Sequence, residues 1–147
     1  MSGVSRVSRW LGSGWERVEE RPYKERGEEF RGVGRHLLVG GGDPGLAAEV
    51  RYFSVAAGGW TSFERHGHAH AVVVLTGRGR VRLGGEEHPL APFDLVYVAP
   101  ETPHRFSADP ASPLGLLCIV DRDRDRPRPV AEGRCPGRAL DPPGTGE

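Results

Sequence analysis

Short apolar runs separated by turn-forming residues divide the chain, and this alternation constrains the fold more than any other feature of the sequence. The runs are rich in Val, Leu, Ile, Tyr and Phe, and they cover residues 36–39, 48–56, 71–75, 79–83, 95–98 and 114–120. Clusters of glycine, proline or acidic residues lie between them, and no amphipathic helical pattern of useful length interrupts the series. Many short strands with frequent turns predict an all-β fold, either a closed barrel or a double-sheet jelly roll.

The length of 147 residues suits a single domain. We expect the barrel to span residues 31–121, because both ends of the chain differ from this centre. Residues 1–30 have no sustained hydrophobic period, so they predict a loosely ordered N-terminal arm. Residues 122–147 begin with alternating Asp and Arg and continue with proline and glycine, a composition that buries too little apolar surface to fold. The sequence therefore predicts a flexible arm before the barrel and a disordered tail after it.

Composition excludes several classes of protein. The 20 basic and 20 acidic residues give a formal net charge of zero, which disfavours binding to nucleic acid. No stretch is long and apolar enough for a membrane helix, and the N-terminus lacks the apolar segment of a secretory signal. Two cysteines, Cys118 and Cys135, are too few for a disulfide framework. These features predict a cytoplasmic protein whose partner is a small molecule rather than a nucleic acid or a membrane.

Histidines gather in one short segment that also contains a glutamate. Glu64, His66, His68 and His70 lie close together in the sequence, and His104 begins a later strand. Alternate side chains of a strand share one face, so Glu64 and His66 are expected to point the same way, and a bend after them would turn His70 to the same side. Neutral imidazoles and a carboxylate that converge inside a barrel suit one divalent transition metal, and the ligand types leave Mn, Fe, Ni, Zn and Co open. The alternative is a set of solvated surface histidines.

The spacing of these residues forms a two-part motif. The first part reads, in order, Gly58, five residues, Glu64-Arg65-His66, three residues, His70, six residues and Gly77. The second part is the segment 93–106, FDLVYVAPETPHRF, in which a turn and a proline-rich bend precede a histidine. This pattern resembles the cupin superfamily, and in particular its small single-domain, metal-binding members of the cupin-2 conserved-barrel type.

The resemblance implies a fold and a ligand set. The fold is the double-stranded β-helix, or jelly-roll barrel, of that family. His66, His70 and His104 fall on the family's metal-ligand positions. Glu64 stands at a further ligand position that usually holds histidine, although it could instead pair with an arginine. Phe93 stands where the second motif usually has glycine.

Two residues near the predicted ligands are candidates for catalytic proton transfer. His68 lies between the ligand positions and is expected in the wall of the pocket. Cys118 lies in an apolar run that should return across the barrel, where it is either a small buried hydrophobe or a thiol that faces the metal. The segment 117–129 also resembles a cupin subgroup that includes a manganese-dependent carbon–sulfur lyase, and this resemblance implies a proton-donating role for Cys118.

The predicted function is that of a metal-dependent enzyme. A Lewis-acidic metal that stabilises an enolate of a small oxygenated metabolite would support isomerase or carbon–sulfur lyase chemistry. The alternatives are a metal-dependent dioxygenase and a non-enzymatic sensor or small-molecule-binding cupin. Arg51, Arg80 and Arg82 could reach an anionic substrate if they face the interior of the barrel. Small cupins commonly exchange an N-terminal strand, so the resemblance also implies a homodimer.

Overall fold

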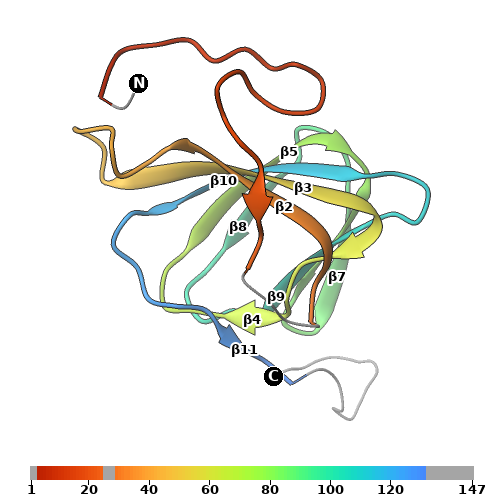
Figure 1. The fold of residues 1–147 in the computed structure, drawn as a ribbon. Coiled ribbons are helices and arrows are strands. Elements are labelled where there is room, and N and C mark those ends of the chain that lie inside the picture. Colours follow the sequence, from red (N-terminus) through yellow and green to blue (C-terminus); the bar gives the residue numbers. More distant parts are fainter. Residues whose placement is uncertain (1–2, 25–28, 132–147) are drawn as a thin grey trace.

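The computed structural model describes residues 3–24 and 29–131, and every regular element in this part of the chain is a strand (Figure 1). The strands are β1 (Arg21–Pro22), β2 (Arg31–Val39), β3 (Ala48–Trp60), β4 (Glu64–Arg65), β5 (His70–Gly77), β6 (Gly79–Leu83), β7 (Glu86–Leu90), β8 (Leu95–Val98), β9 (His104–Ala108), β10 (Leu114–Asp121) and β11 (Arg128–Pro129). No helix within these residues has the length and apolarity that crossing a membrane requires.

The strands form one sheet that curls round on itself (Figure 1). Its main path runs in the order β11-β4-β9-β3-β10-β5-β8, with the pair β1-β2 joined to β3 and the hairpin β6-β7 joined to β9. All the pairings are antiparallel, as expected when short loops connect the strands. A hairpin turn lies at Gly84-Gly85, because Leu83 pairs with Glu86 across it.

The long strand β3 turns a corner that closes the barrel. Most of β3 pairs with β10, whereas its last residue, Trp60, pairs with Ser107 of β9. The corner lies at Gly58, whose φ of 75° is in the left-handed region, and at Gly59, where a Cβ atom would lie 2.4 Å from the carbonyl oxygen of Arg31. Glycine meets both demands because it has no Cβ. The same strand therefore takes part in both halves of the barrel.

Alternation along β3 separates the inside of the barrel from the outside. Phe53 and Val55 belong to the buried core, as do alternate residues of β5 and β10. Tyr52 points to the other face, where the rings of Trp10 and Trp15 pack edge-on against it with centroids 5.4 and 6.4 Å away. Described residues of the predicted N-terminal arm thus cover an aromatic side chain outside the barrel.

The described part of the predicted tail lies against the barrel. After β10 the chain runs to β11, which pairs with β4 on the side opposite the N-terminal segment (Figure 1). Arg128 donates to the Glu101 carboxylate at 2.5 Å, and Asp125 accepts from the backbone N–H of Gly67 at 2.7 Å. These contacts carry the chain ten residues beyond the boundary predicted at 121; Cys135 and the rest of the predicted tail lie outside the described residues.

Phe93 adopts a backbone conformation that favours glycine. Its φ is 71° and its side chain is 81% exposed. The left-handed region costs a non-glycine residue roughly 1–2 kcal/mol, and the greater freedom of glycine in the unfolded chain offsets roughly 0.4–1 kcal/mol of that. We expect Phe93→Gly to raise the free energy of unfolding by about 0.5–1 kcal/mol, measured by urea denaturation. Leu95→Gly, at an exposed position within β8, is the control and should lower it; a lower value for Phe93→Gly would contradict the prediction.

Candidate metal centre and pocket

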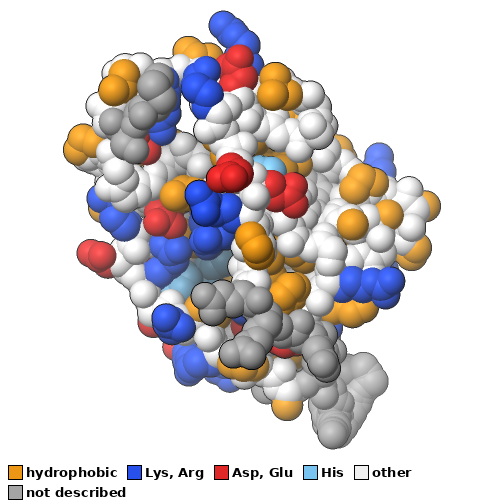
Figure 2. Space-filling view, viewed as in Figure 1, with side chains coloured by type: hydrophobic (Ala, Val, Ile, Leu, Met, Phe, Trp, Pro, Cys, Tyr) orange, Lys and Arg blue, Asp and Glu red, His pale blue; other side chains and the backbone are white. Residues whose placement is uncertain are grey.

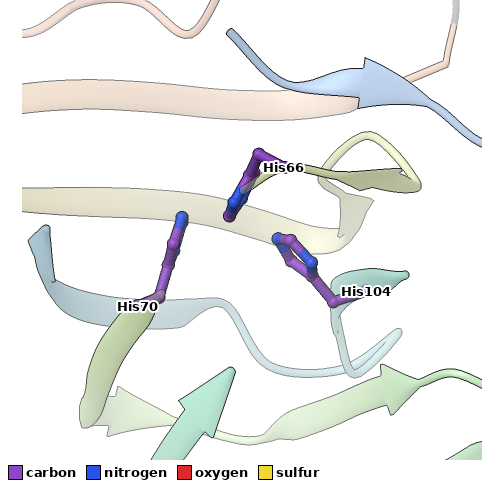
Figure 3. A group of neighbouring side chains, drawn as sticks. All are labelled: His66, His70 and His104. Atoms are coloured by element: carbon purple, nitrogen blue, oxygen red, sulfur yellow. The ribbon is translucent and has the colours of Figure 1, made fainter. Parts of the chain in front are cut away.

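Three imidazoles from distant parts of the chain meet inside the barrel. His66 lies in the bend after β4, His70 is the first residue of β5, and His104 is the first residue of β9. One ring nitrogen from each lies within 4.8 Å of the others, and Figure 3 shows the three rings turned toward a common point. The pairing of Glu64 with His104 joins β4 to β9, and the pairing of His70 with Val98 joins β5 to β8. These pairings fix the positions of the backbone segments from which the three rings project. The bend predicted after His66 thus brings His66 and His70 to one side.

Backbone carbonyls orient two of these rings. The Nδ1 atom of His66 lies 2.7 Å from the carbonyl oxygen of His68, and the Nδ1 atom of His104 lies 2.8 Å from that of Thr102. A carbonyl oxygen only accepts, so each Nδ1 carries the hydrogen and each Nε2 keeps its lone pair. Among the described residues, the buried Nε2 atoms of His66 and His70 have no hydrogen-bond partner. Converging unpartnered imidazole nitrogens are the donor set that a divalent transition metal takes, so these residues fit a metal ion.

A pocket opens beside these histidines. Its cavity of about 220 Å³ is smaller than the roughly 300–1,000 Å³ typical of sites for drug-sized ligands, which indicates a small occupant. Cys118 of β10 lies in its wall, with Sγ 3.3 Å from Nδ1 of His70 and 3.4 Å from Nη2 of Arg51. The residue is 2% exposed and also belongs to the buried hydrophobic core, so a catalytic role for its thiol stays a prediction. Figure 2 shows this hollow, with histidine side chains inside it and basic side chains around its rim.

Comparison with known proteins identifies the family. The family described as Cupin domain matches residues 51–120. A protein from Rhodospirillum rubrum named 1-methylthio-D-xylulose 5-phosphate methylsulfurylase is 43% identical over 115 residues, which cover 78% of this chain and 72% of that protein. The chain belongs to the cupin superfamily.

Solved structures confirm the cupin fold class predicted from the sequence. A cupin-2 conserved-barrel domain protein from Rhodopseudomonas palustris is 39% identical and has a TM-score of 0.79, covering 86% of this chain and 88% of its own. A cupin-2 domain protein from Rhodospirillum rubrum is also 39% identical and has a TM-score of 0.73, covering 90% of this chain and 84% of its own. The present cupin thus has close structural relatives along most of its length.

Two predicted site residues of this cupin have polar partners of their own. Glu64 accepts a 2.6 Å hydrogen bond from Nζ of Lys24 and lies outside the group of three imidazoles, so its partner is a lysine rather than an arginine. His68 stacks on His66 with ring centroids 3.7 Å apart, and its Nδ1 lies 2.9 Å from the carboxylate of Asp125. His68 therefore lies in the pocket wall, as predicted, and metal ligation by Glu64 stays a prediction.

Sequence reasoning missed Lys24 and Asp125. Both lie in segments predicted to be loosely ordered or disordered, where charged residues are common and carry no positional signal. Of the three arginines that could reach an anionic substrate from the interior of the barrel, Arg51 lies in the pocket wall. The side chains of Arg80 and Arg82 line no part of this pocket.

Burial keeps the three imidazoles neutral. It lowers the pKa of His66 to about 4, with the neighbouring His104 as the second cause. Burial is also the largest cause for His70 and for His104, and the pKa of each lies below the ordinary value of 6.5. Neutral imidazole is the form that binds metal, so the ligand set is ready at neutral pH without first losing protons.

The metal-free protein is expected to lose stability as the pH falls from about 6.5 to about 4. The unfolded chain takes up a proton at His66 near pH 6.5, whereas the folded chain takes it up only near pH 4, so the unfolded state binds more protons in this window. The stability that His66 contributes is complete above pH 6.5 and falls by roughly 3 kcal/mol on the way to pH 4. Urea denaturation at pH 7 and pH 4.5, with a chelator present, measures this loss.

Two variants serve as controls for that measurement. His66→Gln should reduce the pH dependence without abolishing it, because the buried His70 and His104 also have lowered pKa values. His88→Gln, at an exposed position in β7, should leave the pH dependence unchanged. Asp125 affects stability in a different pH range. Hydrogen bonds from Gly67 and His68 lower the pKa of its carboxyl group, so its contribution to the free energy of unfolding is lost only below about pH 3.9. Equal stability of the wild type at pH 7 and 4.5 would contradict buried neutral imidazoles.

Proposed function

We propose that this cupin is a divalent-metal-dependent enzyme that cleaves a carbon–sulfur bond in a small oxygenated metabolite, with a 1-methylthio-pentulose 5-phosphate as its substrate. The observation that carries the proposal is the convergence of His66, His70 and His104 beside a small pocket, whose wall contains His70, His104 and Cys118. The name of the relative from Rhodospirillum rubrum supports this choice of substrate. A pocket of about 220 Å³ agrees with a compact sugar derivative.

The three histidines would hold the metal through their Nε2 atoms. A divalent metal bound there supplies Lewis acidity, which polarises a carbonyl group of the substrate and stabilises an enolate. Imidazole ligands suit Mn, Fe, Ni, Zn and Co, so the metal is to be identified by measurement. The carbonyl oxygens of His68 and Thr102 keep the rings of His66 and His104 in the required orientation.

The chemistry balances without an external oxidant or reductant. In a 1-methylthio-2-ketose, removal of the proton on carbon 3 gives an enediolate. The enediolate collapses with cleavage of the bond between carbon 1 and sulfur, and the electron pair of that bond leaves with sulfur. The sulfur takes up a proton and departs as methanethiol, and the hydroxyl group on carbon 3 loses its proton and becomes a carbonyl group. Carbon 1 then takes up a proton, which leaves the sugar skeleton as a dicarbonyl compound.

His68 is the proposed base for the first proton. Asp125 accepts from Nδ1–H of this ring, which leaves the Nε2 lone pair free to accept a proton. The ring is buried in the pocket wall, and its stacking on His66 places it next to the proposed metal ligands. A general base has to reach the proton it removes, and the position of His68 in the pocket wall supports this role.

Cys118 is the proposed acid for the departing sulfur. Burial raises the pKa of its thiol, and the lowering effect of Arg51 is smaller. The thiol therefore keeps its proton at neutral pH and can donate it. Its contact with Nδ1 of His70 places it between the proposed metal ligands and the arginine side of the pocket.

The test is turnover of 1-methylthio-D-xylulose 5-phosphate by protein loaded with each of the candidate metals in turn. We expect methanethiol to form without oxygen, and D-xylulose 5-phosphate, which lacks the methylthio group, to give none. A strict oxygen requirement would favour the dioxygenase alternative. Tight substrate binding without turnover by any metal form would favour the sensor alternative, and either result would overturn the proposal.

A further inference from the structure

Arg51 carries a buried guanidinium group with unused hydrogen-bonding capacity. The residue is 9% exposed, and its Nε atom is buried without a hydrogen-bond partner among the described residues. The group lies over the ring of Phe53, 5.0 Å from the ring centroid, and its Nη2 donates to Sγ of Cys118 at 3.4 Å. A guanidinium has five N–H donors, so a single weak acceptor such as sulfur leaves most of them available.

Arg35 adds a second positive charge on the same wall. It pairs with Phe53 across β2 and β3, and Arg51 lies two residues before Phe53 on β3. Residues two apart on a strand share a face, so Arg35 and Arg51 are diagonal neighbours on the inner side of the barrel. Both residues line the pocket.

The other basic residues of this pocket have carboxylate partners. Lys24 pairs with Glu64 at 2.6 Å, and Arg124 pairs with Glu49 at 2.9 Å. Among the described residues, no carboxylate forms an ion pair with Arg35 or Arg51. An uncompensated buried charge is unfavourable, and an anionic ligand would offset that penalty.

We propose that Arg51 and Arg35 form the subsite that binds the phosphate group of a phosphate-monoester substrate. Guanidinium groups bind phosphate through paired charge-assisted hydrogen bonds, and two neighbouring arginines match its double charge. The inference rests on the proposed function for the identity of the substrate, while the subsite itself rests on two arginines that have no carboxylate partner within the described part of the chain.

The subsite also has a suitable position relative to the histidines. Cys118 contacts Arg51 on one side and His70 on the other, at 3.4 and 3.3 Å. A phosphate held by Arg51 therefore directs the rest of a short sugar chain past Cys118 toward the three imidazoles. In this arrangement the arginines determine which end of the substrate faces the metal.

The experiment measures binding of inorganic phosphate to the full-length protein by isothermal titration calorimetry, in the metal-loaded and the metal-free form. We expect Arg51→Met to weaken phosphate binding about 10- to 100-fold in both forms, since it removes charge-assisted hydrogen bonds. Arg35→Met should weaken it in the same direction. Arg80→Met is the matched control, because Arg80 lies outside this pocket, and it should bind phosphate like the wild type.

A second measurement separates a ligand-binding arginine from a structural one. In phosphate-free buffer, Arg51→Met should have a thermal midpoint at or above that of the wild type, because methionine fills the space without an uncompensated charge. A lower midpoint together with unchanged phosphate affinity would overturn the proposal. Should Arg51→Met fail to fold, the affinity of Arg35→Met decides the outcome.

Further outcomes identify what has failed. Phosphate binding that requires the metal and is unchanged in both arginine variants would overturn the subsite. Acetate binding as tight as phosphate binding would also overturn it, because it would indicate a site for carboxylates. Arginine-dependent phosphate binding in a protein that never releases methanethiol would retain the subsite and reject the proposed function. Methanethiol release with an unchanged KM in Arg51→Met would retain the proposed function and reject the subsite.

Discussion

Replacing His66 with alanine is expected to abolish the proposed metal binding and, with it, the proposed activity. The variant should lose at least ~100-fold in metal affinity, because losing even an outer partner of a metal ligand costs about 10- to 100-fold. His66 is 1% exposed, and one of its ring nitrogens lies within 4.8 Å of a ring nitrogen of His70 and of His104, so alanine would leave the group one ligand short. Elemental analysis of dialysed protein, with stoichiometry per chain, measures the change.

His104→Ala should give the same result, because the two rings come from distant parts of the chain but belong to one group. His88→Ala is the matched control: the residue is an exposed histidine on β7 that is not part of the group, and this variant should keep the wild-type metal content. Circular dichroism of each variant checks that the barrel is retained. Wild-type metal content in both His66→Ala and His104→Ala would mean that any metal binds elsewhere.

The barrel and the three imidazoles could be predicted because both depend on local patterns. Runs of Val and Leu bounded by glycine and proline indicate strands, and the strands observed at 48–60, 70–77 and 114–121 contain the runs from which they were expected. The spacing from His66 to His70 fixes two rings on either side of one bend. His104 is distant in sequence, and the second part of the cupin motif associates it with the other two histidines.

The partners of the site could not be predicted from the same patterns. Asp125 reaches His68 because the chain after β10 turns back to pair β11 with β4, and a short two-residue pairing leaves no periodic signal. Lys24 reaches Glu64 from a segment without hydrophobic period. Both contacts depend on where a polar segment lies on the finished barrel, which single-residue propensities do not encode.

Whether the side chain of Arg51 points into the barrel or away from it depends on the register in which β3 pairs with its neighbours. Alternation predicts that Arg51 and Phe53 share a face, but it leaves open which face is buried. The structure settles this, because Phe53 belongs to the core while Tyr52 packs under Trp10 and Trp15. A shift of one residue in the pairing of β3 would have exposed Arg51 and buried the tyrosine inside the barrel.

Replacing Cys118 with alanine is expected to lower kcat about 100- to 10,000-fold, the range typical for removing a general acid. Metal content should stay unchanged, because Cys118 is not part of the group of three imidazoles. The cost to stability should be about 1 kcal/mol, since the change deletes one buried atom. Steady-state methanethiol release, elemental analysis and urea denaturation measure the three effects separately.

Cys118→Ser separates a proton donor from a nucleophile at the same position. A serine hydroxyl at this place can still donate a proton, although it is a weaker acid than a thiol, so the serine variant should be more active than the alanine variant. A nucleophilic sulfur would attack the thioether and leave a methylthio adduct on Cys118, and both variants would then be equally inactive. Mass spectrometry of the intact protein during turnover distinguishes the two roles: an unmodified chain agrees with proton donation, and an accumulating adduct would contradict it.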